Sequence, residues 1–165
     1  MGRDKALVEV DGSPMAHRVA GALRLAGCSR VVAVGPAYLG VGLEVLADDH
    51  PGEGPLGAIL TALRAASQRP VIVVACDLAW LDAATIVALL DAAAGDPTAD
   101  VVVGRTDRIE PLCALWQPSS AAHLEAAFAR GERAVHRVLD GLARIEVTVD
   151  PMALRNVNSP DDLPE

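Results

Sequence analysis

The chain has 165 residues, a length that fits one domain with a buried core. Hydrophobic residues make up 52% of it, which argues against disorder, and aromatic residues only 2%, so we expect a core of Val, Leu, Ile and Ala. No apolar run is long enough to cross a bilayer and no secretory leader is recognisable, so we expect a cytoplasmic protein with no membrane partner. The net charge of −8 disfavours nucleic acid as a partner. A nucleotide substrate remains compatible with that charge, because a metal ion can offset phosphate charge locally.

The first third of the chain predicts a short strand, a helix and a second strand. Residues 6–10 are typical of a brief strand. Apolar residues at helical spacing predict a helix that starts with Ser13 as its N-cap and Pro14 as its first residue, and that stops at Gly27. The run 30–35 predicts a buried strand. This alternation indicates a doubly wound sheet.

An acidic loop rich in glycine and proline covers residues 48–57 and opens into a helix at Pro55. Two adjacent carboxylates, Asp48 and Asp49, stand in front of it. A glycine-rich loop at a helix N-terminus offers backbone N–H groups and the positive end of the helix dipole, which can hold a phosphate, a ribose or a base edge. The alternative is a simple connector, which is the commoner role of such loops.

The strand around which the chain is organised is predicted at residues 70–77. Its apolar run is short and rich in β-branched residues, which is typical of a strand buried on both faces within a helix-covered parallel sheet. The run ends at Asp77, and ligands of open α/β sheets gather at the carboxyl ends of the strands. Asp77 is therefore a candidate metal or phosphate-side ligand. The alternative is that it caps the turn into the next helix, predicted at residues 82–94.

The second half of the chain continues the alternation of strands and helices, without a repeat or a linker. We therefore expect one domain over residues 1–165, with a three-layer α/β/α architecture and a mostly parallel, doubly wound sheet. Two amides, Asn156 and Asn158, precede a helix start in the tail. The further predicted elements are strands at 100–104, 111–116 and 144–149, and helices marked by the apolar residues of 124–128 and 135–142.

Five short motifs follow one another along the chain: Gly-x-Asp-Lys at 2–5, Gly-Pro-Leu-Gly at 54–57, Cys-Asp at 76–77, Pro-Leu-Cys-Ala-Leu at 111–115 and Asn-Val-Asn-Ser-Pro at 156–160. Their order is that of similar motifs in the molybdenum cofactor guanylyltransferase family. Each is weak alone, but five in one order are hard to obtain by chance, so the chain resembles this family over nearly its whole length. The resemblance implies a nucleotide-diphospho-sugar-transferase-like fold. It also implies Mg²⁺-dependent transfer of GMP from GTP to the terminal phosphate of molybdopterin-bound molybdenum, with release of pyrophosphate.

The chain departs from this family at its beginning. The family's Leu-Ala-Gly-Gly loop, and the strand before it that is central to the sheet, have no counterpart here, so we expect an N-terminally truncated domain. Loss of a central strand would leave two unpaired edges inside a hydrophobic sheet. We expect that the start was assigned at an internal Met, because Met1 falls where the family has one. The alternative is a truncated relative with impaired activity.

The resemblance also assigns roles to individual residues. Asp77 and Lys5 would be catalytic, Asp77 as the Mg²⁺ ligand and Lys5 as the group that neutralises phosphate charge. The residues alone favour an ordinary surface lysine at Lys5, because most lysines are exposed. Either Asp48 or Asp49 would bind the ribose or help to position the metal. The other substrate contacts implied are Arg3 on the triphosphate, Gly54, Pro55 and Leu56 in the loop, and Asn156 and Asn158 on the pterin or the outer shell of the metal.

Other activities remain open at this point. The cytidylyltransferase that acts on the same cofactor shares the opening motif and the sheet, although the Gly-Pro-Leu loop and the Asn-rich tail favour the guanylyl form. Other nucleotidyltransferases of this fold match fewer motifs. An alternative from a different functional class is a non-catalytic nucleotide-binding protein that kept the fold. We expect GTP and the molybdenum cofactor as substrates, and transient contact with cofactor-biosynthesis or acceptor proteins.

Overall fold

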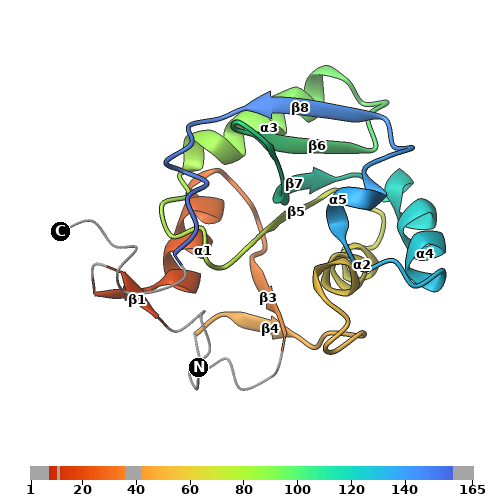
Figure 1. Cartoon of the computed structure of the whole chain (residues 1–165). Coiled ribbons are helices and arrows are strands. Elements are labelled where there is room, and N and C mark those ends of the chain that lie inside the picture. The colour runs from red at the N-terminus through yellow and green to blue at the C-terminus, as the bar shows by residue number, and fades with distance from the viewer. Residues whose placement is uncertain (1–7, 11, 36–41, 158–165) are drawn as a thin grey trace.

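The structure, a computed structural model, describes residues 8–10, 12–35 and 42–157, and its elements alternate between strands and helices (Figure 1). The strands are β1 (Glu9–Val10), β2 (Ser13–Pro14), β3 (Val32–Val34), β4 (Glu44–Leu46), β5 (Val71–Val74), β6 (Val101–Arg105), β7 (Ile109–Trp116) and β8 (Arg144–Thr148). The helices are α1 (Met15–Leu25), α2 (Pro55–Ala65), α3 (Ala83–Gly95), α4 (Ala121–Ala129) and α5 (Val135–Val138), with a 3₁₀ turn at Pro118–Ser120. None of the helices in these described ranges is long and apolar enough to span a membrane.

The largest sheet has four strands in the order β5-β7-β6-β8. Strand β7 runs antiparallel to both of its neighbours, whereas β6 and β8 are parallel. It follows that β5, β6 and β8 all point the same way and that β7 is the one reversed strand. Strands β3 and β4 form a separate parallel pair, and β1 and β2 a short antiparallel one.

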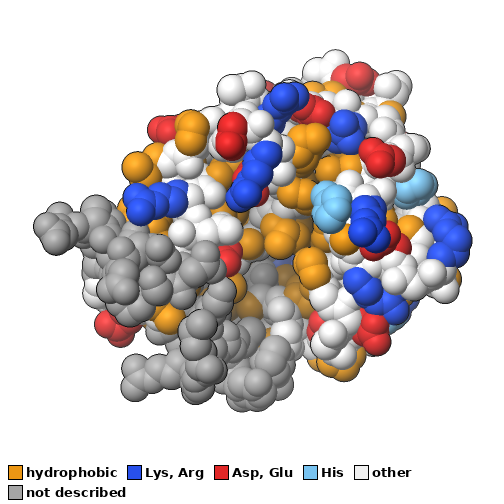
Figure 2. Space-filling view, in the orientation of Figure 1, with side chains coloured by type: hydrophobic (Ala, Val, Ile, Leu, Met, Phe, Trp, Pro, Cys, Tyr) orange, Lys and Arg blue, Asp and Glu red, His pale blue; other side chains and the backbone are white. Residues whose placement is uncertain are grey.

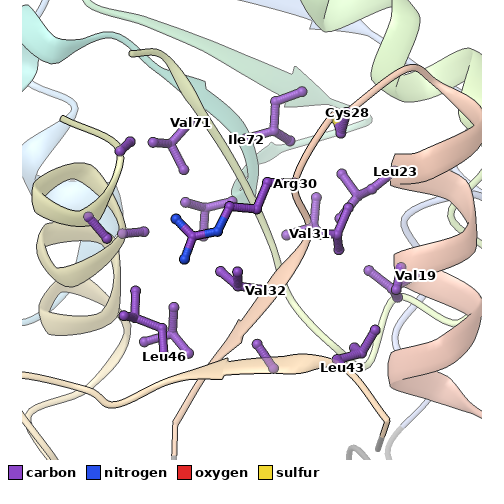
Figure 3. A pocket seen from close by; sticks show the side chains of 18 of the residues that line it. Val19, Leu23, Cys28, Arg30, Val31, Val32, Leu43, Leu46, Val71 and Ile72 are labelled. Atoms are coloured by element: carbon purple, nitrogen blue, oxygen red, sulfur yellow. The ribbon is translucent and has the colours of Figure 1, made fainter. Parts of the chain in front are cut away.

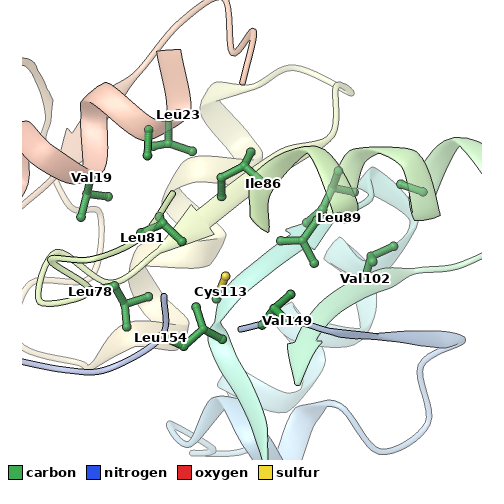
Figure 4. Close-up of a cluster of buried hydrophobic side chains, with 13 residues drawn as sticks. Val19, Leu23, Leu78, Leu81, Ile86, Leu89, Val102, Cys113, Val149 and Leu154 are labelled. Atoms are coloured by element: carbon green, nitrogen blue, oxygen red, sulfur yellow. The ribbon is translucent and has the colours of Figure 1, made fainter. Parts of the chain in front are cut away.

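The core lies in two layers, one on each face of the four-stranded sheet. Because side chains alternate across a strand, Val102 packs toward α1 and α3, whereas Val101 and Val103 pack toward α2, α4 and α5. Figure 4 shows the first layer, where Ile86 and Leu89 of α3 lie over Val102 and Cys113. Helices on both faces of a sheet make a three-layer α/β/α domain, so the predicted fold class is confirmed.

The boundaries of α1 and α5 differ from those that the sequence predicted. Ser13 and Pro14 pair with β1 as strand β2, and α1 begins only at Met15, without a side-chain cap. Pro14 has the extended backbone angles φ −54° and ψ 136°, which lie outside the helical region, so it is the N-cap residue of α1 and not its first helical residue. Helix α5 is also shorter than the apolar residues of 135–142 suggested, since it ends at Val138.

The prediction that residues 70–77 form a strand buried on both faces is wrong in one respect. Each residue of β5 is only half-buried, and so is each residue of β3. The reason is a cavity of about 710 Å³ between these two strands, lined by them and by α1 and α2 (Figure 3). We call this cavity the β3–β5 groove. Figure 2 shows hydrophobic side chains in the hollow at the centre of the molecular face that it draws.

The two strands that line this groove belong to different sheets. Among the described residues, β3 pairs only with β4, and β5 pairs only with β7. The second edge of each strand borders the groove, which is lined by Val31–Val34 and Val71–Val74.

Candidate functional site

Asp77 lies in a turn directly after β5, at the carboxyl end of the strand, and is partly exposed. Pairing with β7 continues for one more residue, since the Ala75 N–H donates to the Leu112 carbonyl at 2.9 Å. Asp77 does not cap the next helix. That role belongs to Asp82, whose Oδ1 accepts from the Thr85 N–H at 2.8 Å. The alternative role of Asp77, as a cap of the turn that leads into the next helix, thus does not extend to α3, which begins six residues later and is capped by Asp82.

The C-terminal tail returns to this same turn. The Val157 N–H donates to the Asp77 carbonyl at 3.0 Å, so the exposed Asn156 lies next to the Asp77 turn along the backbone. Val157 is buried in a small apolar cluster with Val10, Met15 and Ala79, which holds the tail in place. The structure thus joins two segments that the sequence predicted to share a site, 80 residues apart. Asn158, Lys5 and Arg3 lie outside the described residues.

Arg18 is a residue at this turn that the sequence analysis did not single out. From α1 its Nε donates to the Ala79 carbonyl at 3.0 Å, and one terminal nitrogen lies 3.5 Å from the Val10 carbonyl. The guanidinium thereby attaches α1 to the segment that follows Asp77, at a carbonyl two residues further along the chain. The sequence offers one indication of this role, which is that Arg18 is a charged residue between Ala16 and Val19, two buried positions of α1.

The two carboxylates of the acidic loop contact α2. Asp48 Oδ1 accepts from the His50 N–H at 2.9 Å and lies 3.2 Å from the Thr61 hydroxyl oxygen. Asp49 pairs with Arg64 at 3.0 Å, and its N–H donates to Thr61 at 3.1 Å. These contacts attach the loop to the helix that follows it. Asp48 is half-buried and Asp49 is exposed.

The Gly-Pro-Leu motif forms the start of α2. Gly54 is the N-cap residue, with φ +83°, a left-handed conformation that favours glycine, and Pro55 takes the first helical position. Both residues are exposed. Leu56 is 0% exposed and packs in the core, so its side chain is not available to a substrate, contrary to the role that the resemblance implied.

The acidic loop is held from its other side by a cluster that we call the Arg133 clamp, made of His50, Glu53, Phe128 and Arg133. The Arg133 Nε lies 2.5 Å from Glu53 Oε2, and its guanidinium lies 3.9 Å from the centre of the Phe128 ring. The His50 ring contacts the same Phe128 ring, with a centroid distance of 4.5 Å. No sequence signal could have found this cluster, because the ion pair joins residues 80 positions apart.

Replacing Arg133 with alanine is expected to lower the free energy of unfolding by about 1–2 kcal/mol. The estimate combines a half-exposed ion pair, worth about 0.2–1 kcal/mol, with a cation–π contact worth about 0.5–1 kcal/mol. Arg108→Ala is the matched control, since in the described part of the chain the ion pair of that exposed side chain is with Glu110, two residues away. Urea unfolding of both variants measures the difference. Equal stabilities would show that the clamp does not hold the loop.

The described residues contain no group of three or more His, Cys, Asp or Glu side chains placed to share a metal. Asp77 offers one partly exposed carboxylate at a strand end. Mg²⁺ is commonly held by one or two carboxylates together with substrate phosphates and water, so this single donor fits Mg²⁺ and does not fit a structural zinc site.

Comparison with known proteins agrees with this arrangement. The sequence profile of the MobA-like NTP transferase domain matches residues 1–147. The molybdenum cofactor guanylyltransferase of Pseudomonas syringae is 32% identical over 168 residues, covering 96% of this chain and 82% of that protein. The corresponding enzyme of Rhodobacter capsulatus is 32% identical over 173 residues, covering 99% and 86%.

The fold has close counterparts among solved structures. The molybdopterin-guanine dinucleotide biosynthesis protein A of Archaeoglobus fulgidus superposes with a TM-score of 0.78 at 24% identity, covering 98% of this chain and 87% of that one. A profile that spans most of the sequence, relatives above 30% identity and a shared fold all point the same way. The chain belongs to the MobA-like NTP transferase family, and thus to the nucleotidyltransferases.

Proposed function

We propose that this protein transfers GMP from GTP to the terminal phosphate of the molybdenum cofactor and releases pyrophosphate. The names of its relatives support guanylyl transfer to this cofactor. The observation on which the proposal rests is the backbone hydrogen bond from Val157 to Asp77, because it brings the tail with Asn156 to the carboxyl end of β5. A strand end with a carboxylate and an amide beside it is where a nucleotide and its metal bind in open α/β sheets.

The reaction needs no covalent intermediate on the protein. An oxygen of the acceptor phosphate attacks the α-phosphorus of GTP, and the bond from that phosphorus to the oxygen of the departing pyrophosphate breaks. The site has to align the two groups and to neutralise the charge on them. Mg²⁺, when bound, would supply electrostatic stabilisation at the phosphates. We assign Asp77 as its protein ligand, and Lys5 and Arg3 as positive charges for the triphosphate.

The acidic loop is proposed to bind the nucleoside end of GTP. Exposed Gly54 and Pro55 at the start of α2 provide a surface without bulky side chains beside a helix N-terminus. Of the two neighbouring carboxylates, we assign the ribose contact to Asp49, since it is exposed whereas Asp48 is half-buried with its Oδ1 bound to the loop itself. Asn156 and Asn158 are assigned to the pterin substrate or to the outer shell of the metal.

Thermal unfolding with nucleotides tests the substrate. GTP with Mg²⁺ is expected to raise the midpoint of unfolding, because a ligand that binds only the folded state stabilises it by mass action, by about 2.7 kcal/mol at one hundred times its Kd. CTP with Mg²⁺ is the matched control and is expected to give a smaller rise. A larger rise with CTP would favour cytidylyl transfer. No rise with either nucleotide would contradict a nucleotidyltransferase role for the 165-residue chain.

A further inference from the structure

A small apolar cluster, which we call the junction cluster, is separate from the two core layers of the four-stranded sheet. Its members are each at most 2% exposed and come from three segments that are distant in the sequence: Val10, Met15, Ala79 and Val157. In the sequence, each segment closely follows a residue assigned to the site, which is Lys5, Asp77 or Asn156. The junction cluster is therefore where the described parts of these three segments meet.

The turn that carries Asp77 is held by three hydrogen bonds to other segments. Before it, the Ala75 N–H donates to a carbonyl of β7, and the Asp77 carbonyl itself accepts from the tail. Both are backbone hydrogen bonds, which a side-chain substitution leaves in place. The third runs from Arg18 Nε to the Ala79 carbonyl, at 3.0 Å. Of these three contacts, Arg18 therefore makes the one that a substitution can remove.

Arg18 also reaches a second segment of the junction cluster. It is half-buried in α1, and one terminal nitrogen of its guanidinium lies 3.5 Å from the Val10 carbonyl oxygen. A guanidinium is planar and carries its N–H donors in fixed directions, so it can hold two carbonyl groups at a defined separation. A lysine ammonium is a point charge on a flexible stem and defines no such separation. The position therefore uses the shape of arginine as well as its charge.

We propose that Arg18 is a positioning residue for guanylyl transfer. By bridging the carbonyl groups of Val10 and Ala79, it holds the Asp77 turn against α1 and the β1–β2 hairpin, and so sets where the Asp77 carboxylate stands relative to the substrates. This role rests on the proposed function, and it needs no contact between Arg18 and a substrate. A displacement of a reacting or catalytic group by about 1 Å can lower a rate about 10²-fold, even when its cause lies away from the reaction.

Steady-state kinetics of Arg18→Met tests this role, since methionine keeps an apolar stem and removes the N–H donors. The value of kcat per folded molecule is expected to fall at least about tenfold, while KM for GTP changes less than about threefold. The reason for this split is that the acidic loop, to which we assign the nucleoside, is held by separate contacts with α2. The matched control is Arg24→Met, at an exposed arginine in the last turn of the same helix, which is expected to keep the parental kcat.

Arg18→Lys separates positioning from charge. Lysine retains the positive charge but cannot bridge two carbonyl groups in a fixed geometry, so kcat is expected to stay at least about fivefold below that of the parent. If Arg18 acted instead as a positive charge on the substrate phosphates, lysine would restore most of the rate. Recovery of the parental kcat with lysine would therefore overturn the positioning role.

Hydrogen exchange of the Val157 amide, followed by NMR, gives a readout that needs no catalytic activity. This N–H donates to the Asp77 carbonyl, so a loosened turn exposes it to solvent more often. Arg18→Met is expected to speed its exchange at least about tenfold relative to the parent. Exchange in Val101–Val103 of β6, which are 0% exposed in the main core, is expected to stay unchanged and serves as the control for the fold.

Two further kinetic results would overturn the proposal, namely parental kcat in a folded Arg18→Met protein and an equal loss of kcat in Arg24→Met. Equal acceleration of exchange at Val157 and in β6 would do the same, because Arg18 would then stabilise the protein as a whole. A parent chain that transfers no GMP would contradict the proposed function instead. The exchange of Val157 would then decide by itself whether Arg18 holds the turn, and unchanged exchange would overturn that role.

Discussion

Replacement of Asp77 by asparagine is expected to lower the rate of GMP transfer at least about 10²-fold while the chain stays folded. The change removes the negative charge that we assign to Mg²⁺, and losing one preorganised electrostatic group at a reacting centre costs about this much. The fold should tolerate it, because Val157 binds the backbone carbonyl of Asp77, which the substitution leaves in place. The side chain is partly exposed, so stability should change by about 0.5 kcal/mol or less.

Asp82→Asn is the matched control for this variant. Asp82 is a carboxylate five residues further along, and its function is to cap α3. Asparagine caps a helix about as well as aspartate, so both stability and transfer should be retained. Transfer is measured with GTP and molybdenum cofactor, on variants and parent of the same chain length. A folded Asp77→Asn protein that transferred GMP at the parental rate would contradict the assignment of Asp77 as metal ligand.

The sequence predicted those parts of the molecule that depend on local patterns. α2 begins at the predicted Pro55, and α3 (Ala83–Gly95) lies one residue from the predicted 82–94 at each end, since apolar spacing and a proline at the first helical position act within a few residues. The end of β5 at the Cys76-Asp77 turn follows from an apolar run that stops at a charge. These patterns involve residues close together in the chain, so a single sequence is sufficient to detect them.

The features that the sequence could not predict depend on contacts between distant segments. Periodicity says nothing about the pairing of Arg133 with Glu53, or about the guanidinium of Arg18 on the Ala79 carbonyl. Leu56 belongs at once to a recognisable loop motif and to the apolar face of α2, and only packing shows that its side chain is buried. The partial exposure of β5 could not be predicted from the sequence either, because the burial of a strand depends on neighbouring elements that its own residues do not specify.

Gly57→Ala is expected to lower the free energy of unfolding by about 1–2 kcal/mol, although alanine normally stabilises a helix. A Cβ atom at Gly57 would lie 2.8 Å from the His50 Cβ and 3.4 Å from the His50 carbonyl oxygen. His50 cannot easily move away, because its ring contacts Phe128 in the Arg133 clamp. Overpacking of this kind costs about 1–3 kcal/mol, and the higher helix propensity of alanine recovers about 0.5–1 kcal/mol of it.

Gly21→Ala in α1 is the matched control, and the expected change has the opposite sign. Beyond its own helix, a Cβ at Gly21 meets no atom of the described chain within 4 Å, so alanine should stabilise the protein by about 0.5–1 kcal/mol. Urea unfolding at constant pH measures both variants against the parent. Because the acidic loop packs tightly against α2 at Gly57, we expect alanine to destabilise the protein at this position and not at Gly21. Equal gains in the free energy of unfolding at the two glycines would show that His50 moves aside. The loop would then be held less firmly than its contacts with Thr61, Arg64 and Phe128 indicate.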